Sequence, residues 1–453
     1  MPKLKPLLLI AGLCTAFGAQ ASMFDAQTAA AEKDYKTAAI HFKRSADLGL
    51  AKAQSSISQL YLHGAGIKKD PIKSFVYMAM AYDQTKSDEL RGNMAGIYRS
   101  LAKNQQEIAL TQYEKFSARY SQQALTKRIY PVLKARPIVW KAGKKLKQAD
   151  NRGVQISIFS VNRMPLMTTI YQYDIAEDGS VRDISVAHDF FANTSMKKNA
   201  TMAMYYAKYS VRKRKNGQPV YVENYRTRWV QKELTREYIK DELPNFDRLI
   251  NQLEKLAKAD NAGAMYELAM YYIAYPALQV KLAKALDYLQ RAAELQHPEA
   301  AAEYAYHLFR GYGRARNPKA GFKYLLQGGI AGSANAQYRL GRELLSGNIV
   351  ERDITKAMFW LEQAVEAEHA AAKYWLARTL IDHTKLDEQS SKRVAQLLDD
   401  VAESENVNPT WYYYRAKHQN LIGKQKRAQS LFTEAKDLAK EYGWNVGDWV
   451  LQG

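Results

Sequence analysis

The C-terminal half of the chain repeats its hydrophobic pattern every 36 residues. One position of the repeat is alanine, and a large apolar residue follows it four residues later: Ala264, Ala300, Ala336 and Ala372, then Leu268, Tyr304, Leu340 and Leu376. A second small position precedes an aromatic residue and a leucine: Ala285, Gly321 and Ala357, then Tyr288, Tyr324 and Trp360, then Leu289, Leu325 and Leu361. Small and large residues at helical spacing predict two packed amphipathic helices per repeat. The aromatic positions are more typical of a core than of a ligand site.

A turn is expected between the two helices of each repeat. Gly347 precedes Asp353 by six residues, and Gly311 has the same spacing to Asn317. Glycine is favoured where a helix ends, and Asp or Asn where the next one begins.

The same spacing occurs near the N-terminus, in Ala53, Ile57, Gly64 and Asp70. The stretch AQSSISQLYLHGAGIKKDPIKSFVYMAMA and the stretch AQYRLGRELLSGNIVERDITKAMFWLEQA both resemble Sel-one-like repeats, which are relatives of the tetratricopeptide repeat. The resemblance implies a right-handed α-solenoid whose concave face binds peptides, and therefore a scaffold or adaptor role. The segment around Trp411–Tyr414 and Ala428–Ala435 departs from the period by one residue, so we interpret it as a terminal cap.

The central part of the chain has a strand-like pattern instead. Tyr171, Tyr173 and Ile175 alternate with polar residues, Asp178-Gly179 predicts a tight hairpin with positive φ angles, and Ile184 and Val186 continue the pattern. A helix is predicted from Ser195 to Lys208, and a last strand from Val220 to Val230. The predicted order is strand, strand, helix, strand.

This block resembles the C-terminal domain of the TonB energy-transducer family. The matching residues are Ile175, Asp178, Gly179, Val181, Ile184, Val186, Ala200, Ala203, Gly217, Pro219 and the strand that ends near Trp229. The family has a proline shortly after the helix, whereas this chain has Val211 and cations there. A TonB transducer also has a membrane anchor and a Pro-rich span, which this chain replaces with helical repeats.

The resemblance implies that the block captures an extended segment of an outer-membrane transporter as an added strand. The candidate partner-binding residues are Tyr221, Glu223, Tyr225 and Arg228. The alternative for each of them is a solvated side chain on an ordinary sheet strand.

The first 21 residues have the layout of a secretory signal peptide. Lys3 and Lys5 precede an apolar run from Leu7 to Phe17, and small residues at Ala19 and Ala21 predict cleavage after Ala21. The run is too short to span a bilayer easily. Since Cys14 is the only cysteine, the mature chain would contain no disulfide and no cysteine nucleophile. We expect a protein of the bacterial periplasm.

The positive charge is concentrated in the middle of the chain. Residues 121–235 contain 21 Lys and Arg against 8 acids, so they carry +13 of the net +20. Lys141, Lys144, Lys145 and Lys147 are candidates for binding an anionic envelope surface, and an acidic protein patch is the alternative. A nucleic-acid partner is not expected of an exported protein. The alternative without a binding role is that the basic segment is a solvated linker.

No enzyme signature is present. The eight histidines form no H-E-x-x-H pair, and the sequence contains neither a P-loop nor a G-x-S-x-G motif. We therefore expect no catalytic residue, no metal and no cofactor.

Together these patterns predict an α+β fold in which two α-solenoid arms of helix-turn-helix repeats flank a small TonB-like β-β-α-β domain. The expected parts are a signal peptide (1–21), N-terminal repeats (22–120), a basic linker (121–153), the TonB-like domain (154–235) and C-terminal repeats (236–453). The expected function is that of a non-enzymatic periplasmic adaptor, an accessory of TonB-dependent uptake. The alternative is an envelope scaffold that binds other partners through its solenoid and has no role in transport.

Overall fold

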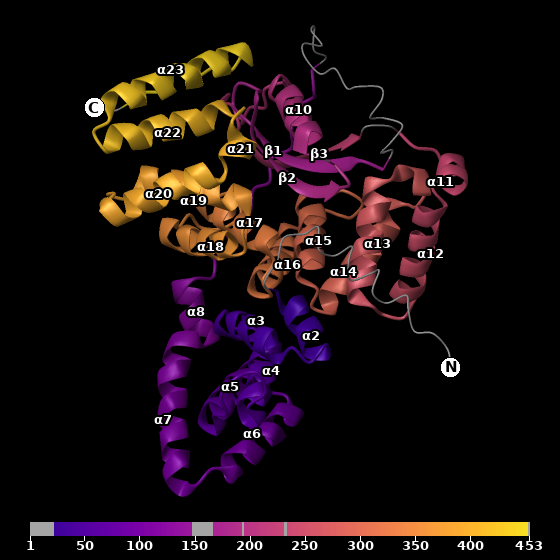
Figure 1. Ribbon diagram of the computed structural model, residues 1–453, viewed down its shortest axis with the longest axis vertical. Helices are drawn as coiled ribbons and strands as arrows, with labels where there is room; N and C mark the ends of the chain where they lie inside the picture. The colour runs from indigo at the N-terminus through magenta and orange to yellow at the C-terminus, as the bar shows by residue number, and fades with distance from the viewer. Residues whose placement is uncertain (1–21, 147–165, 193, 231–232, 452–453) are drawn as a thin grey trace. The chain divides into compact units, whose positions relative to one another are not determined.

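The computed structural model describes residues 22–146, 166–192, 194–230 and 233–451 (Figure 1). The chain forms two compact units. Unit 1 comprises residues up to Pro137, Ala259–Tyr266 and Leu286–His369, and unit 2 comprises Ile138–Lys258, Glu267–Ala285 and the residues from Ala370 onward. Within the described ranges, no helix combines the length and the apolar character needed to cross a membrane.

Paired helices account for most of unit 1. The N-terminal pairs and the helices that follow them are α2 (Met23–Ala31), α3 (Tyr35–Asp47), α4 (Ala51–His63), α5 (Pro71–Thr85), α6 (Asp88–Ser100), α7 (Lys103–Tyr120) and α8 (Gln122–Arg128). The later pairs are α13 (Ala262–Ala274), α14 (Leu282–Glu294), α15 (Pro298–Arg310), α16 (Pro318–Ile330), α17 (Ala334–Ser346) and α18 (Ile354–Glu366). The units divide within α13 and α14, each of which contributes residues to both.

The repeat boundaries lie where the sequence predicts them. Gly64, Gly311 and Gly347 end α4, α15 and α17 in the left-handed conformation. Asp70, Asn317 and Asp353 begin α5, α16 and α18, and each side chain accepts a hydrogen bond from a backbone N–H in the first turn. The predicted helix-turn-helix units are thus confirmed.

The repeating small and large residues form the solenoid core. The alanines from Ala264 to Ala372 and the large residues four positions after them are all buried, and so are Ala285, Ala357 and Trp360. The core interpretation of these positions is therefore confirmed, although Tyr288 and Tyr324 are only half-buried.

The two arrays are not the separate arms that the repeat pattern predicts. In unit 1 the backbone N–H of Met23 donates to the carbonyl of Ala331 (2.8 Å), and Met23 is fully buried. The Arg44 guanidinium pairs with Glu366 at 2.6 Å. The N-terminal repeats therefore dock directly on the repeats of residues 298–369.

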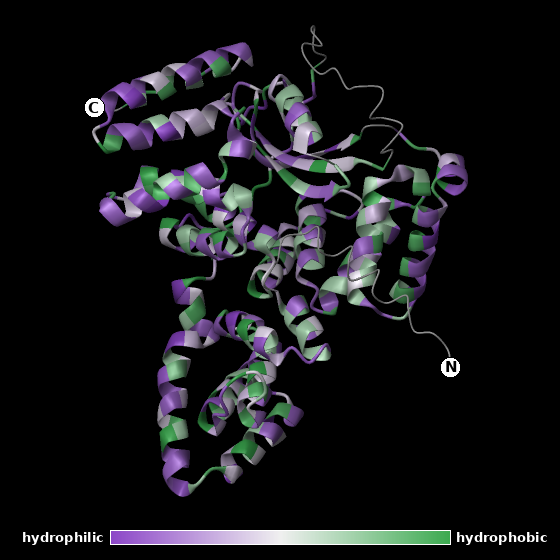
Figure 2. Cartoon of the chain, viewed as in Figure 1, coloured by the Kyte–Doolittle hydropathy of each residue, from purple (hydrophilic) through white to green (hydrophobic). Residues whose placement is uncertain are grey.

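The segment after α7 is attached to the same repeats. Lys356 donates through Nζ to the carbonyls of Thr126 and Tyr130, each at 2.8 Å, and the Trp360 indole donates to the carbonyl of Ile129. Leu133 then forms an antiparallel bridge with Val350. This part of the predicted linker is consequently a bonded element of unit 1. Figure 2 shows hydrophilic residues along much of α7, interrupted by apolar ones.

Unit 2 contains a three-stranded antiparallel sheet. Its strands are β1 (Thr168–Ile175), β2 (Val181–Phe190) and β3 (Val222–Val230), in the order β2-β1-β3, and α10 (Thr194–Tyr205) lies between β2 and β3 in the chain. The predicted strand-strand-helix-strand order is confirmed. The helix ends three residues before the expected Lys208. Val186 is 39% exposed and does not join Ile184 in the core.

The hairpin between β1 and β2 differs from the expected tight turn. Only Gly179 has a positive φ, +80°, while Asp178 does not. The N–H of Ala176 donates to the carbonyl of Ser180, and the N–H of Gly179 donates to the carbonyl of Ala176. The loop therefore has three residues, with a left-handed glycine at its end.

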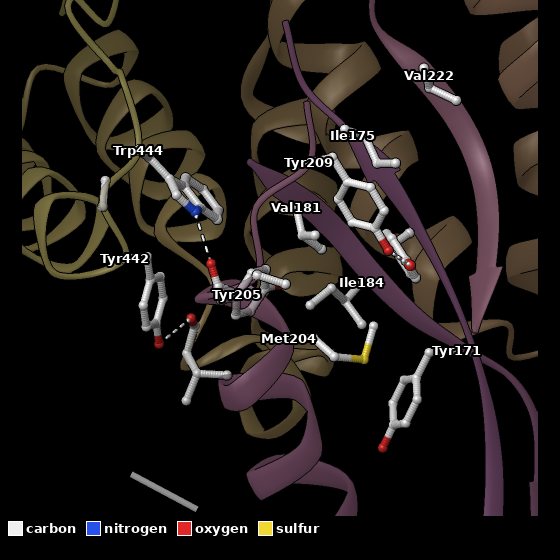
Figure 3. Close-up of a cluster of buried hydrophobic side chains, with 14 of the residues drawn as sticks. Tyr171, Ile175, Val181, Ile184, Met204, Tyr205, Tyr209, Val222, Tyr442 and Trp444 are labelled. Atoms are coloured by element: carbon white, nitrogen blue, oxygen red, sulfur yellow. Dashed lines mark hydrogen bonds between the residues drawn. The ribbon is translucent and has the colours of Figure 1, made fainter. Parts of the chain in front are cut away.

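The sheet shares its hydrophobic core with the C-terminal helices of unit 2 (Figure 3). These helices are α19 (Ala370–His383), α20 (Glu388–Asp400), α21 (Ala402–Glu405), α22 (Pro409–Leu421) and α23 (Gln425–Glu441); α11 (Arg236–Glu242), α12 (Pro244–Lys258) and the short helix η2 (Pro276–Leu278) also belong to this unit. Tyr442 and Trp444, just after α23, pack with the buried Tyr205. The Trp444 indole donates to the Tyr205 carbonyl. The strand-bearing block is thus built into the C-terminal repeats.

Candidate interaction surfaces

Strand β3 lies at one edge of the three described strands and carries most of the predicted partner-binding residues. Tyr225 packs edge-on against Tyr173 and Tyr209, so its ring belongs to the sheet core. Arg228 donates to the carbonyl of Ala274 at 3.2 Å and pairs with Glu233 at 2.8 Å. Glu223 is half-buried.

Tyr221, just before β3, points to a polar cluster on the sheet. Its hydroxyl donates to Asp174 at 3.1 Å and to Asp183 at 3.2 Å. The four predicted residues are therefore not gathered into one side-chain site. Tyr221, Tyr225 and Arg228 contribute to the packing of unit 2 itself.

Two bulges build this polar cluster. The pairing register shifts beside Asp174 on both sides of β1, and Asp183 in β2 and Asn224 in β3 have positive φ angles of 47° and 54°. The N–H of Asn224 donates to Asp174 at 2.9 Å. Each bulge inserts an extra residue and redirects a side chain. The alternating sequence pattern contains no signal for this.

The cluster connects the sheet to α19. Arg378 pairs with Asp183 at 2.7 Å, and its guanidinium stacks on Trp375, 3.9 Å from the ring centroid. Glu405 lies nearby in the fold, where burial raises its pKa to about 7 although a hydrogen bond from Asn408 opposes the shift. Since the Asp183–Arg378 pair is mutually neutralised and buried, we interpret it as a positioning contact within unit 2.

The predicted anion-binding lysines Lys141, Lys144 and Lys145 are exposed, and Lys147 lies outside the described residues. The structure brings a second basic segment, Arg212–Lys215, next to them. In the sequence these cations stand out only as a charged run after the predicted helix. Their run beside Asn216-Gly217 was the available signal, but its position opposite residues 141–146 depends on tertiary pairing.

The buried histidines of the repeats have structural roles. His297 accepts a hydrogen bond from the N–H of Ala300 at the start of α15 and stacks on Tyr266, and burial lowers its pKa to about 3. His369 stacks on Tyr338, and burial lowers its pKa to about 4. In the described part of the chain, no three His, Cys, Asp or Glu side chains are grouped as a metal site.

Comparison with known proteins identifies the repeats. The family model for the Sel1 repeat matches residues 26–50, 51–86, 262–297, 298–333 and 334–369. These residues are therefore similar to Sel1 repeats, and proteins built from such repeats generally mediate protein–protein interaction. No curated protein matches the chain significantly.

Two solved structures are similar to the chain. One is a Sel1 repeat protein from Oxalobacter formigenes, with 18% identity over 42% of this chain and 78% of that chain and a TM-score of 0.34. The other is c5321, a protective antigen present in uropathogenic Escherichia coli strains that displays an SLR fold. It has 16% identity over 92% of this chain and 84% of that chain, with a TM-score of 0.27.

Proposed function

We propose that the chain, which is similar to Sel1 repeat proteins over five segments, is a non-enzymatic adaptor of the bacterial periplasm that binds protein partners. The repeats support the adaptor role, because a stacked-helix array offers an extended surface for partners. The charged, apolar and small-residue layout of residues 1–21 supports export.

The finer proposal is that unit 2 docks an extended peptide as a fourth strand beside β3, in the manner of TonB-type domains. The strand order β2-β1-β3, with α10 inserted before β3, is the observation that carries it. A transporter segment held in this way would make the protein an accessory of TonB-dependent uptake. Because Tyr225 and Arg228 already contact their own unit, recognition would depend mainly on main-chain hydrogen bonds.

Binding of defined peptides tests the docking proposal. The mature chain, residues 22–453, is titrated with synthetic N-terminal peptides of TonB-dependent outer-membrane transporters, and scrambled peptides serve as controls. We expect binding of the native sequences, and a photo-crosslinker at Thr227 in β3 should capture the peptide while one at Val186 in β2 should not. Failure to bind at high micromolar peptide would reject the transport role.

The second candidate is an envelope scaffold with no role in transport. It is favoured by the core that the sheet shares with Tyr442 and Trp444, because that core gives the sheet a structural role within unit 2. A deletion strain separates the two candidates. Only the first predicts a growth defect on iron chelates and other nutrients that enter through TonB-dependent transporters.

A further inference from the structure

Two basic segments that are distant in the sequence pair with each other in unit 2. The N–H of Leu146 donates to the carbonyl of Lys208 at 2.9 Å, and the N–H of Ser210 donates to the carbonyl of Lys144 at 2.8 Å. An antiparallel bridge also joins Lys145 to Tyr209. We call residues 140–146 and 208–218 together the basic ribbon.

The second segment is itself folded back as a hairpin. The N–H of Arg214 donates to the carbonyl of Gln218 at 2.7 Å, and Lys213 bridges to Pro219. Gly217 allows the turn through its φ of +82°. These main-chain bonds hold the turn in place, so its cations stay beside those of the first segment.

The ribbon contains eight cations. Lys208 is half-buried and pairs with Asp178 at 3.9 Å, whereas the other seven are exposed: Lys141, Lys144, Lys145, Arg212, Lys213, Arg214 and Lys215. In the described ranges of the chain, none of the seven forms an ion pair with a carboxylate. The sequence contains no acid in 130–149 or 190–222. Mutual repulsion of these cations is relieved when an anionic surface approaches.

Apolar side chains are interspersed with the cations. Leu146 is 46% exposed and Val211 is 42% exposed, while Arg214 lies over the ring of Trp140 at 5.5 Å. An acidic protein patch needs only the charges. A lipid surface also rewards exposed apolar groups and an aromatic ring at the headgroup level. The composition of the ribbon therefore favours a membrane.

We propose that the basic ribbon binds the anionic surface of a phospholipid membrane, with the turn cations Arg212, Lys213 and Lys215 contributing alongside Lys141, Lys144 and Lys145. The ribbon holds the protein at the membrane through headgroup phosphates. This surface is independent of peptide docking at β3, so either proposal can fail without the other.

Vesicle flotation tests the proposal with the mature chain. Vesicles of about 30 mol% phosphatidylglycerol in phosphatidylethanolamine should retain the protein, and phosphatidylcholine vesicles should not. Retention should fall steeply as salt rises from about 0.05 M to about 0.5 M, because the Debye length shrinks. Absence of binding to the anionic vesicles at low salt overturns the proposal.

Charge-matched variants locate the surface. The variant R212Q/K213Q/K215Q should lose roughly 100-fold in vesicle affinity, since each cation near an anionic bilayer contributes about a factor of five. The control K68Q/K69Q/K103Q removes the same charge from exposed lysines of unit 1 and should change affinity by less than about threefold. Equal losses in both variants would mean that only net charge matters, which contradicts the proposal.

A charge-conserving variant separates lipid from an acidic protein. L146S/V211S should bind anionic vesicles more weakly and should be retained by immobilised polyglutamate as well as the parent chain is, because only the lipid contact uses apolar area. Retention on polyglutamate without vesicle binding would assign the ribbon to an acidic protein instead. Circular dichroism of each variant verifies that the exposed substitutions leave the fold intact.

Discussion

Single residues decide whether the hairpin of the sheet can pack. Gly179 has a φ of +80°, and a Cβ at this position would lie 2.1 Å from the carbonyl oxygen of Tyr209. The N–H of Tyr209 donates to the Gly179 carbonyl at 2.8 Å, so the two backbones are in direct contact. The glycine of the Asp178-Gly179 pair is thus required both by the backbone conformation and by a neighbour that the local sequence does not reveal.

Gly179→Ala should destabilise unit 2 by more than about 2 kcal/mol, because backbone strain and a backbone clash act together. Gly217→Ala is the matched control. Its φ is +82° and nothing lies within 4 Å of the added Cβ, so only the strain of about 1 kcal/mol is expected. Urea unfolding of the two variants measures the difference. Equal losses would contradict the predicted contact with Tyr209.

His297 makes the free energy of unfolding of unit 1 depend on pH. Burial lowers its pKa from 6.5 to about 3. Below pH 6.5 the unfolded chain binds a proton that the folded chain excludes. The free energy of unfolding is therefore not reduced by His297 above pH 6.5, and it decreases as the pH falls from 6.5 towards 3.

His297→Asn should reduce this dependence while preserving the helix cap, because the Asn oxygen can still accept from the N–H of Ala300. Between pH 6.5 and 5, the native chain should lose roughly 2 kcal/mol more of its unfolding free energy than the variant does. Denaturant titrations of both proteins at these two pH values provide the comparison. Parallel losses would show that His297 titrates normally.

At the scale of elements, the sheet depends on a short segment after α23. Trp444 is 6% exposed and joins the core that contains Tyr205, Ile184 and Val222. The Arg182 guanidinium lies over the Trp444 ring, 3.8 Å from the centroid. A resemblance confined to residues 154–235 predicts the strand order but not this shared core, because the contributing residues are more than 200 positions apart in the sequence.

Trp444→Ala should cost about 3 to 5 kcal/mol and should increase amide hydrogen exchange in β1 and β2 as well as near the mutation. Trp449→Ala is a suitable control, because Trp449 is half-buried and stacks mainly on Tyr413, so its loss should be less than half as large. Unchanged exchange in the strands of the Trp444 variant would indicate that the sheet folds independently of the C-terminal repeats.

At the scale of the whole molecule, the N-terminal helices and the later repeats of unit 1 form one body. Lys356 is more than nine-tenths buried. Its ammonium donates hydrogen bonds to two backbone carbonyls at and just after the C-terminal end of α8. A buried ammonium of this kind is stable only because carbonyl oxygens replace its water.

Lys356→Met should leave two carbonyls without their donor and weaken the attachment of residues 126–137 by about 1 to 3 kcal/mol. Limited trypsin digestion should then cleave this segment faster than in the native chain. Lys323→Met, at an exposed position on α16, should leave the rate unchanged. Equal cleavage rates in all three proteins would show that the segment is not held by Lys356.

The sequence by itself determined the helix-turn-helix repeats, their glycine and Asp or Asn boundaries, and the strand-strand-helix-strand order. These features follow from local spacing: the helical period of small and large residues, the αL preference of glycine, and the alternation in strands. Ala300, Gly311 and Asn317 illustrate this, because each has the role that its position in the repeat predicts.

Only the tertiary structure decided which distant segments meet. The contacts of Met23 with Ala331, of Asp183 with Arg378 and of residues 141–146 with 208–214 join parts of the chain that share no local pattern. Such contacts depend on how helices and strands match one another in shape and charge. No local stretch of sequence contains the information that determines this packing. The basic run that contains Lys141, Lys144 and Lys145 is visible in the sequence, whereas its pairing with residues 208–214 depended on the tertiary structure.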